Sequence, residues 1–359
     1  MTSRERVLAA IAREVPDRVP VDISWGLTPL VKEVFRQKTG QTDYLAYFGV
    51  DTRHARIANT QCPHDFSSYF AEHADGERMR IGEWGIGSVP LTDSDLHFQR
   101  VASPLKNARS VGDVADFPLP DITADYRMDL FRSQVKEFIS GGFAACGPMT
   151  NTLFETAWQI RGHEEFFMDM LERPDMTECL LDRLTALRVR QARLFAEAGV
   201  DVLMLGDDVA MQTGMMMHPD LWRTWFKPRL AAIIDAARGV RPGLPVFYHS
   251  DGNPTAIIDD LIEIGVTILN PVQPECVDPA ALKEKYGDRL AFWGTMGIQH
   301  TLPFGTPADV CREVKTRIET VGKGGGLLLG PSHMIEPEVP WENLAALYEA
   351  VKKYGSYRL

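Results

Sequence analysis

The second half of this chain alternates short apolar runs with amphipathic stretches, and this rhythm constrains the fold more than any other feature. From Ala144 onward the apolar runs are continuous, as is typical of strands buried on both faces of a parallel sheet. Most are followed by a segment of helical periodicity, often with proline in its first turn, where the missing N–H costs no hydrogen bond. The pattern predicts an α/β protein built from β-α-β units.

Eight strands are expected along the whole chain, at residues 18–23, 54–60, 143–146, 201–205, 245–249, 266–270, 290–293 and 326–329. Helices are expected at residues 175–197, 219–237, 254–264, 279–286 and 307–320. Eight strands alternating with helices predict a (β/α)₈ TIM barrel. An open doubly wound sheet is the alternative, but no GxGxxG motif follows the first strand to support a dinucleotide site.

Residues 61–120 interrupt this rhythm. Within them, residues 78–87 have the pattern of a β-hairpin, and residues 104–120 that of a loop. We therefore expect one domain, residues 1–359, with a β-hairpin and loop insertion at about 61–120 near the mouth of the barrel.

Composition excludes several classes of partner. The chain is 45% hydrophobic and 24% charged, as in soluble globular proteins, and its net charge of -11 would repel phosphate backbones and anionic lipid. We therefore expect neither nucleic acid nor a membrane surface as a partner. The five cysteines are scattered and odd in number, which argues against a disulfide framework. No signal-peptide or membrane-span pattern is apparent, so we expect a cytoplasmic protein.

Three of the predicted strands end in residues that can bind a metal. One runs into His249, the next into Glu275 and Cys276, and the last into His333. The carboxyl ends of barrel strands share one face, and imidazole, thiolate and carboxylate are the ligands of zinc. The sequence therefore predicts a metal-centred active site with His249, Cys276 and His333 as ligands, and either Asp251 or Glu275 completing it. A purely structural role is the alternative for each residue, since such a histidine can simply donate to a loop carbonyl.

Two adjacent carboxylates, Asp207 and Asp208, follow the strand at residues 201–205. Neighbouring residues cannot both face inward, so we expect one of them to line the pocket and the other to anchor a loop. We take both, together with Asp251, as catalytic candidates. The substrate-binding candidates are Gln212, Gln273, Glu83 and Trp84, the last two from the hairpin.

Several ordered motifs resemble the uroporphyrinogen decarboxylase superfamily. They lie at residues 4–8, 16–21, 154–158, 161–162, 206–208, 212, 269–274, 293–295 and 340–343. The resemblance covers essentially the full chain and implies a TIM barrel with its active site at the strand carboxyl ends; dimers are common in the superfamily. It also implies one of two chemistries. These are cofactor-free porphyrinogen decarboxylation, and zinc-dependent methyl transfer to or from a corrinoid protein or a thiol.

Two departures from the superfamily pattern choose between these chemistries. Where decarboxylases carry an arginine-rich segment after the first strand, residues 22–28 of this chain hold no cation to pair with the many carboxylates of a porphyrinogen. Where thiol-methylating members carry His-x-Cys and a later cysteine, this chain has His249-Ser250-Asp251 and His333.

The resemblance and its departures together predict a zinc-dependent methyltransferase. It would move a methyl group from a small methoxylated or methylated compound to a corrinoid (cobalamin) carried by a partner protein. A decarboxylase of a small carboxylic acid, with Asp208 or His249 as proton donor, is the alternative. We expect any carboxylate of the substrate to meet Arg53, Arg56 or Arg161.

Overall fold

The computed structural model describes residues 1–23, 25–73, 79–91 and 98–357. Seven parallel strands form its central sheet in the order β1-β5-β6-β9-β10-β11-β12. They are β1 Thr52–His54, β5 Ala144–Thr150, β6 Val202–Gly206, β9 Val246–His249, β10 Ile268–Asn270, β11 Ala291–Met296 and β12 Leu327–Pro331.

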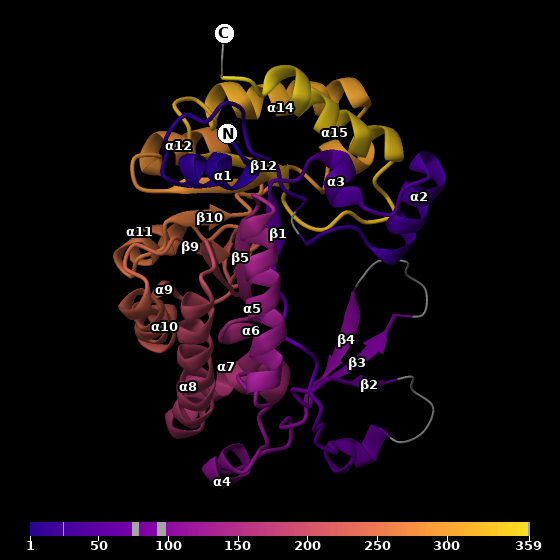
Figure 1. Ribbon diagram of the computed structural model, residues 1–359. Helices are drawn as coiled ribbons and strands as arrows, with labels where there is room; N and C mark the ends of the chain where they lie inside the picture. The colour runs from indigo at the N-terminus through magenta and orange to yellow at the C-terminus, as the bar shows by residue number, and fades with distance from the viewer. Residues whose placement is uncertain (24, 74–78, 92–97, 358–359) are drawn as a thin grey trace.

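Helices surround this sheet (Figure 1). They are α1 Ser3–Ile11, α2 Pro29–Thr39, α3 Tyr44–Phe48, α4 Val111–Ala115, α5 Asp125–Ser140, α6 Phe154–Arg161, α7 His163–Glu172, α8 Pro174–Ala198, α9 Pro219–Trp225, α10 Lys227–Val240, α11 Ile258–Glu263, α12 Pro279–Tyr286, α13 Thr301–Phe304, α14 Pro307–Thr320 and α15 Trp341–Tyr354.

The expected first strand, at residues 18–23, is reduced to a short bridge that closes the barrel. The Asp22 amide donates to the Leu329 carbonyl of β12 at 3.0 Å, and the Asp51 amide, just before β1, donates to the Val21 carbonyl at 3.0 Å. This segment therefore joins the two edges of the sheet. Pro20 has no N–H to donate, which limits the length of the ladder. The predicted TIM-barrel fold is confirmed, with its first strand shorter than expected.

The prediction of a strand at residues 54–60 is wrong. The strand in this region is β1, which ends at His54, and only the Ala55 amide still bonds to the neighbouring strand, at the Cys146 carbonyl. The next amide, of Arg56, donates instead to the side chain of Gln134 on α5. The Gln134 side chain therefore takes a backbone amide that would otherwise continue the strand pairing. For this reason the strand ends where the sequence pattern alone predicts that it continues.

The helices expected at 279–286 and 307–320 are confirmed, whereas the one expected at 219–237 is broken in two. α9 ends at Trp225, and α10 begins at Lys227 with Pro228 in its first turn. Proline has no N–H for the preceding turn and its ring clashes there, so one continuous helix cannot form.

The insertion contains the expected hairpin. β2 Arg80–Ile81 pairs antiparallel with β3 Gly87–Pro90, and β3 pairs with β4 Gln99–Ala102. Arg78, part of the expected hairpin, lies outside the described residues. The stretch expected to be a loop, 104–120, also holds α4, whose first turn is fixed by a capping box of Ser110 and Asp113.

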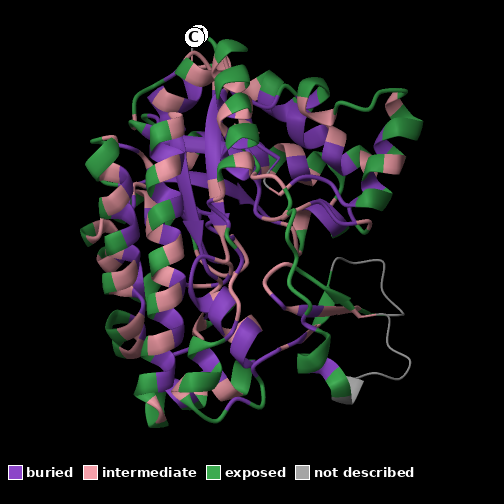
Figure 2. Cartoon of the chain, turned by 60° about the horizontal axis from the view of Figure 1, so that its bottom comes forward, coloured by how far each residue is buried: buried purple, intermediate pink, exposed green. Residues whose placement is uncertain are grey.

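The barrel interior is filled by apolar side chains and closed at one end. Val7 and Ile11 of α1 belong to the same buried cluster as Met204, Phe247 and Trp293 of the strands. α1 thus covers the amino-terminal end of the barrel, and Figure 2 shows the strands buried among helices whose outer faces are exposed. The opposite end is left for the loops that follow the strands.

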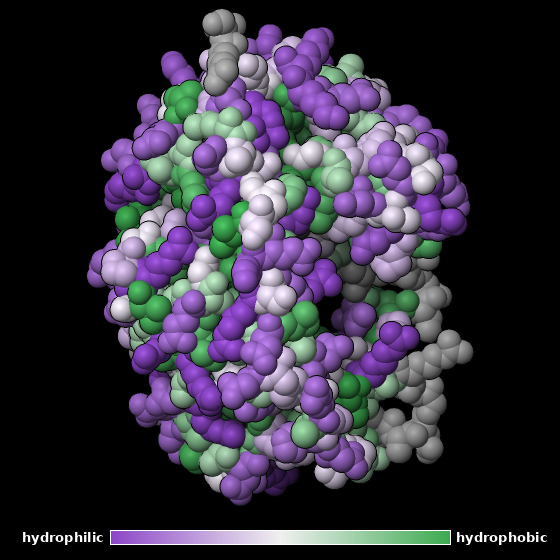
Figure 3. Space-filling view, viewed as in Figure 1, coloured by the Kyte–Doolittle hydropathy of each residue, from purple (hydrophilic) through white to green (hydrophobic). Residues whose placement is uncertain are grey.

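One face of the molecule is predominantly polar. On the face seen in Figure 3, hydrophobic residues are scattered among hydrophilic ones. Among the described residues, no helix combines the length and the apolar character that crossing a membrane requires.

Candidate metal centre

His249, Asp251 and His333 meet at the carboxyl ends of β9 and β12. Each offers one atom that can bind a metal, and these atoms lie within 4.8 Å of one another. The two imidazole rings have their centres 6.3 Å apart. His249 is the last residue of β9, and His333 comes two residues after β12. Both expected histidines therefore lie in this group, and Asp251 joins them.

A neighbouring amide fixes the orientation of His249. Asn270, at the end of β10, donates from Nδ2 to the Trp293 carbonyl at 2.8 Å. This leaves Asn270 Oδ1 facing His249 Nδ1 at 2.6 Å, so Nδ1 carries the hydrogen. The Nε2 atom of a neutral imidazole then presents its lone pair toward the pocket. Histidine ligands in metalloproteins are commonly oriented in this way by a partner of their other ring nitrogen.

Two carboxylates face that same nitrogen. His249 Nε2 lies 3.5 Å from Asp208 Oδ1 and 3.8 Å from Asp251 Oδ1. The Asp208 oxygen is also held by the Asp251 amide at 2.8 Å. A lone pair and two carboxylates repel one another unless a proton or a cation lies between them, so the chemistry of these donors suits a divalent metal.

Asp207 and Asp208 divide the roles expected of them. Asp207 is buried and accepts from the backbone amides of Leu153 and Glu155 at 3.0 Å each. Leu153 is the N-cap of α6 and has no side-chain acceptor, so Asp207 caps this helix from β6. Asp208 faces the pocket. The sequence could predict this division, but not which residue would take which part.

Glu155 is a site residue that the sequence analysis missed. Its Oε2 accepts from the Asp208 amide at 3.0 Å. Burial, together with the nearby carboxylates of Asp208 and Asp207, raises the pKa of Glu155 to about 9, so its carboxyl carries a proton at neutral pH. Burial also raises the pKa of Asp207 to about 6. The sequence feature that could have identified Glu155 is its position in the first turn of the helix that follows β5.

The other two expected ligands lie apart from the group. Glu275 Oε1 accepts from the Gln299 amide at 2.9 Å, and Cys276 borders an open groove with Asp278 and Arg317. Burial, with the carboxylates of Glu275 and Asp251, raises the pKa of the Cys276 thiol to about 11. Within the described residues, neither belongs to the cluster of metal-binding atoms that includes Asp251.

The expected substrate-binding residues are dispersed. Gln212 lies on the rim, where its Nε2 donates to Gln299 Oε1 at 2.6 Å. Gln273 is buried, and its Oε1 accepts from the amide of Gly252, next to Asp251, at 3.3 Å. Gln273 therefore supports the loop that carries Asp251.

The hairpin residues contact arginines of the barrel. Glu83 pairs with the buried Arg127 at 2.8 Å, and the indole of Trp84 lies 5.0 Å from the Arg188 guanidinium. Arg188 donates to the carbonyls of Thr152 and Asn151 in the loop before α6. These contacts fasten the insertion to the loop beside the pocket.

Two of the arginines expected to meet a substrate carboxylate are engaged elsewhere. Arg161 is buried and pairs with Asp169 at 2.7 Å. Arg53 donates to the carbonyls of Val50 and Thr52 and stacks on the ring of Phe143. All three guanidinium nitrogens of Arg161 are engaged in this way, whereas in Arg53 the two hydrogen bonds come from Nη1 alone.

Known proteins of two activities resemble this chain. Methylcobamide:CoM methyltransferase MtaA of Methanosarcina barkeri is 29% identical over 191 residues, 53% of each chain. Uroporphyrinogen decarboxylase of Coxiella burnetii is 26% identical over 273 residues, 73% of each chain. The chain thus spans about half the length of the first relative and about three quarters of the second.

The fold has a counterpart among solved structures. A methyltransferase from Methanosarcina mazei matches over 99% of each chain with a TM-score of 0.67 and 20% identity, which shows a shared fold. The family model described as uroporphyrinogen decarboxylase (URO-D) matches residues 100–354, well over half of the sequence. The chain therefore belongs to the uroporphyrinogen decarboxylase family.

Proposed function

We propose that this chain is a zinc-dependent methyltransferase that moves a methyl group from a small methoxylated or methylated compound to a corrinoid carried by a partner protein. The observation that carries the proposal is the convergence of His249, Asp251 and His333 at the mouth of the barrel. The similarity to a methylcobamide:CoM methyltransferase supports the choice of reaction.

The donor set fits zinc. Two imidazoles and one carboxylate are a ligand set of catalytic zinc sites, which keep a position open for water or substrate. We assign these three residues as the ligands, without Cys276 or Glu275. When bound, zinc supplies Lewis acidity toward the departing oxygen, and a reduced corrinoid supplies a strong nucleophile for the methyl group.

The neighbouring residues orient the proposed metal ligands, and one of them carries a proton. Asn270 keeps the Nε2 lone pair of His249 directed into the pocket. Asp208 holds the Asp251 amide and so fixes the loop that presents its carboxylate. Glu155, protonated at neutral pH, keeps a further negative charge out of the cluster.

Decarboxylation of a small carboxylic acid is the second candidate. It is favoured by the longer similarity to uroporphyrinogen decarboxylase, and Asp208 or His249 would be its proton donor. This reaction releases carbon dioxide and needs no methyl acceptor, so the two candidates differ in both product and co-reactant.

The test combines metal analysis with single-turnover transfer. Purified protein is saturated with zinc, desalted and assayed for bound metal, and is then mixed with cob(I)alamin and a methoxylated donor. We expect one zinc per chain and the absorbance of methylcobalamin. Carbon dioxide release from a small carboxylic acid, supplied in place of the donor and without cobalt, would support the decarboxylase instead.

Matched variants separate the ligands from their neighbours. Asp251→Ala and His333→Ala are expected to lose both zinc and transfer, whereas Cys276→Ser keeps both. Loss of zinc in Cys276→Ser, with retention in Asp251→Ala, would overturn the ligand assignment.

A further inference from the structure

One loop beside the metal-binding group leads to positively charged side chains to which the proposed function gives no part. In this loop, the Gly26 carbonyl accepts from the amide of Ile335, two residues after His333, at 2.9 Å. Its neighbour Trp25 makes an edge contact with the His249 ring, with the two ring centres 5.1 Å apart. The loop therefore contacts both histidines' segments at the mouth of the barrel.

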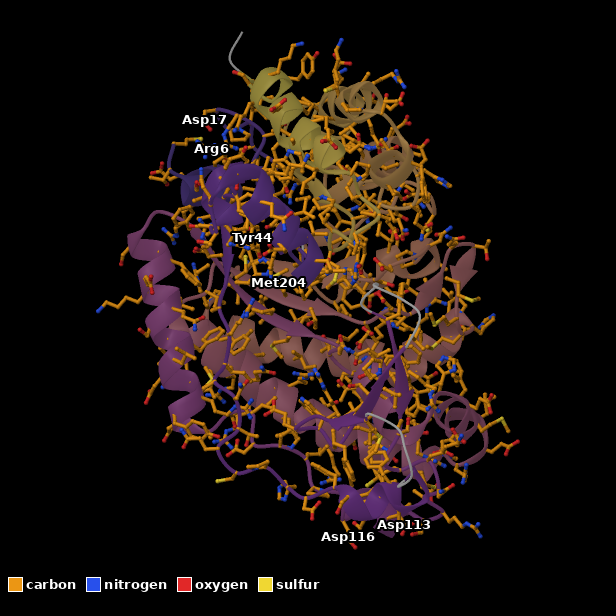
Figure 4. The ribbon with its side chains drawn as sticks, turned by 90° about the vertical axis from the view of Figure 1, so that its right-hand side faces the viewer. Arg6, Asp17, Tyr44, Asp113, Asp116 and Met204 are labelled. Atoms are coloured by element: carbon orange, nitrogen blue, oxygen red, sulfur yellow. The ribbon has the colours of Figure 1, made fainter. Side chains whose placement is uncertain are left out.

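Tyr44 of α3 lies against this loop. A Cβ atom on Gly26 would come within 2.9 Å of the Tyr44 hydroxyl oxygen, so the glycine leaves room for the phenol. Tyr44 is half-buried, and burial raises the pKa of its hydroxyl, which therefore keeps its proton and can donate a hydrogen bond. Tyr44 lies near the middle of the molecule in Figure 4, and Figure 3 shows the surface hollowed between the part formed by α2 and α3 and the insertion.

Arg56 is an exposed residue two positions after β1. Its backbone amide donates to Gln134, but its guanidinium makes no hydrogen bond or ion pair with any residue that the structure describes. Of the charged groups around Tyr44, Arg56 most strongly opposes the rise in the pKa of the phenol. Burial lowers the pKa of His54 at the end of β1, and the charge of Arg56 adds to this. The Arg56 guanidinium therefore lies close to both rings.

The acidic groups near Arg56 and Tyr44 already have other partners. Asp22 accepts from side chains of β1 and β11 at 2.5 and 2.9 Å, and Asp43 accepts from an amide in the first turn of α3 at 3.0 Å. Lys32 adds a second cation, 5.9 Å from the centre of the Tyr44 ring. Although the chain holds 49 acidic and 38 basic residues, no described carboxylate is paired with the Arg56 guanidinium.

We infer that Arg56 and Tyr44 bind a carboxylate of the methyl donor, which is therefore a methoxylated carboxylic acid. This inference rests on the proposed function and deepens it, because it names the class of substrate. The planar fork of an arginine and the O–H of a phenol can both donate to one carboxylate. Trp25 adjoins Gly26 on one side and His249 on the other, so an aromatic ring along it would connect the carboxylate to an ether oxygen at the metal-binding group.

The test measures binding by calorimetry, with zinc-loaded protein and without any corrinoid. The probes are 3- and 4-methoxybenzoate and their uncharged amides, 3- and 4-methoxybenzamide, which have nearly the same shape. We expect the wild type to bind at least one of the acids about 10–100-fold more tightly than its amide, because a hydrogen bond to a charged group is stronger than one to a neutral group.

Variants assign this preference to one side chain. Arg56→Gln should bind acid and amide with equal affinity, whereas Arg56→Lys, which keeps the charge without the fork, should retain part of the preference. Arg312→Gln, at an exposed arginine of α14, should keep the full preference. Since the Arg56 side chain bonds to no described residue, Arg56→Gln should also keep the melting temperature of the wild type.

Two results would overturn the subsite: equal affinities for acid and amide in the wild type, or an undiminished preference in Arg56→Gln. Methyl transfer from the uncharged amides is assayed separately. Transfer from the amides without any preference for the acids would mean that the subsite alone fails. A preference for the acids without transfer from any of the four probes would mean that the proposed function fails while the carboxylate site stands.

Discussion

The two ends of the barrel treat carboxylates in opposite ways. At the amino-terminal end, the fully buried Asp51 and Asp201 are each paired with arginines. At the carboxyl-terminal end, Glu155, Asp208 and Asp251 crowd around one another and a histidine nitrogen. The same residue types are therefore paired with arginines at one end and gathered beside a histidine at the other.

The amino-terminal network is satisfied by the chain itself. Asp51 binds Arg6 at 2.8 Å and Arg18 at 2.8 Å, and also accepts from the Val21 amide. Arg6 pairs in addition with Asp17 at 2.6 Å, which holds the pKa of the Asp17 carboxyl well below its usual range. Figure 4 shows Arg6 and Asp17 together at one end of the molecule. This network holds α1 against the closing segment of the barrel.

Removing one side of the amino-terminal network should give the largest effect on stability. Asp51→Ala leaves Arg6 and Arg18 without their shared partner, and breaking such a buried pair costs about 3–5 kcal/mol. We expect this loss in the unfolding free energy measured with urea. Asp251→Ala is the matched change at the other end, and in metal-free protein it should cost far less, since it relieves repulsion. Equal losses in the two variants would remove the contrast between the ends.

Zinc should raise the unfolding free energy of the protein, and only the residues at the carboxyl-terminal end should be needed for this gain. At about 100 times its dissociation constant, a ligand that binds only the folded state adds about 2.7 kcal/mol. Wild type and Cys276→Ser should gain this amount in thermal unfolding. Asp251→Ala should gain nothing, and a gain in that variant would place the metal elsewhere.

The orientation of His249 should set how tightly zinc binds. Replacing a residue that orients a metal ligand typically costs 10–100-fold in affinity. We therefore expect Asn270→Ala to weaken zinc binding about 10–100-fold in a chelator competition titration. Asn107→Ala changes an exposed asparagine of the insertion and should leave the affinity as it is; the same loss in both variants would argue against orientation as the cause.

Local sequence patterns were sufficient for the barrel but not for its first two strands. Residues 245–249 and 266–270 are apolar, buried on both faces and bounded by helices, so pattern and structure agree there. At 18–23 and 54–60 the pairing depends on Pro20 and on a side chain of α5, which no local window contains. Such non-local competition for backbone hydrogen bonds limits prediction from a single sequence.

The place of the candidate site was predictable, but the set of side chains that meet there was not. That His249 and His333 end strands on one face follows from the topology of a barrel. Whether Asp251 or Glu275 points inward depends on loop backbone bonds, such as that between Asp208 and the Asp251 amide. Glu155 was missed because its raised pKa arises from its neighbours in space.

The last prediction concerns how stability depends on pH at the carboxyl-terminal end. Burial and the neighbouring carboxylates raise the pKa of Glu155 to about 9 in the folded protein, from an ordinary value of 4.5. Between these two values the unfolded chain is ionised while the folded chain keeps its proton. The unfolding free energy of metal-free protein should therefore fall as pH rises through this window, since the unfolded state binds fewer protons there. Asp207, with a pKa raised to about 6, adds to the fall at the acid end of the window.

Glu155→Gln removes one titrating group while keeping the shape of the side chain and an acceptor for the Asp208 amide. Its unfolding free energy should fall less steeply between about pH 6 and pH 9, so its advantage over the wild type grows with pH in urea titrations with chelator present. Glu338→Gln, at an exposed glutamate, should follow the wild-type slope. If the unfolding free energy of Glu155→Gln changed with pH in the same way as that of the wild type, Glu155 would be ionised in the folded protein. The carboxyl-terminal end would then tolerate its crowded charges without a proton, and the contrast with the paired carboxylates of the amino-terminal end would lose its electrostatic basis.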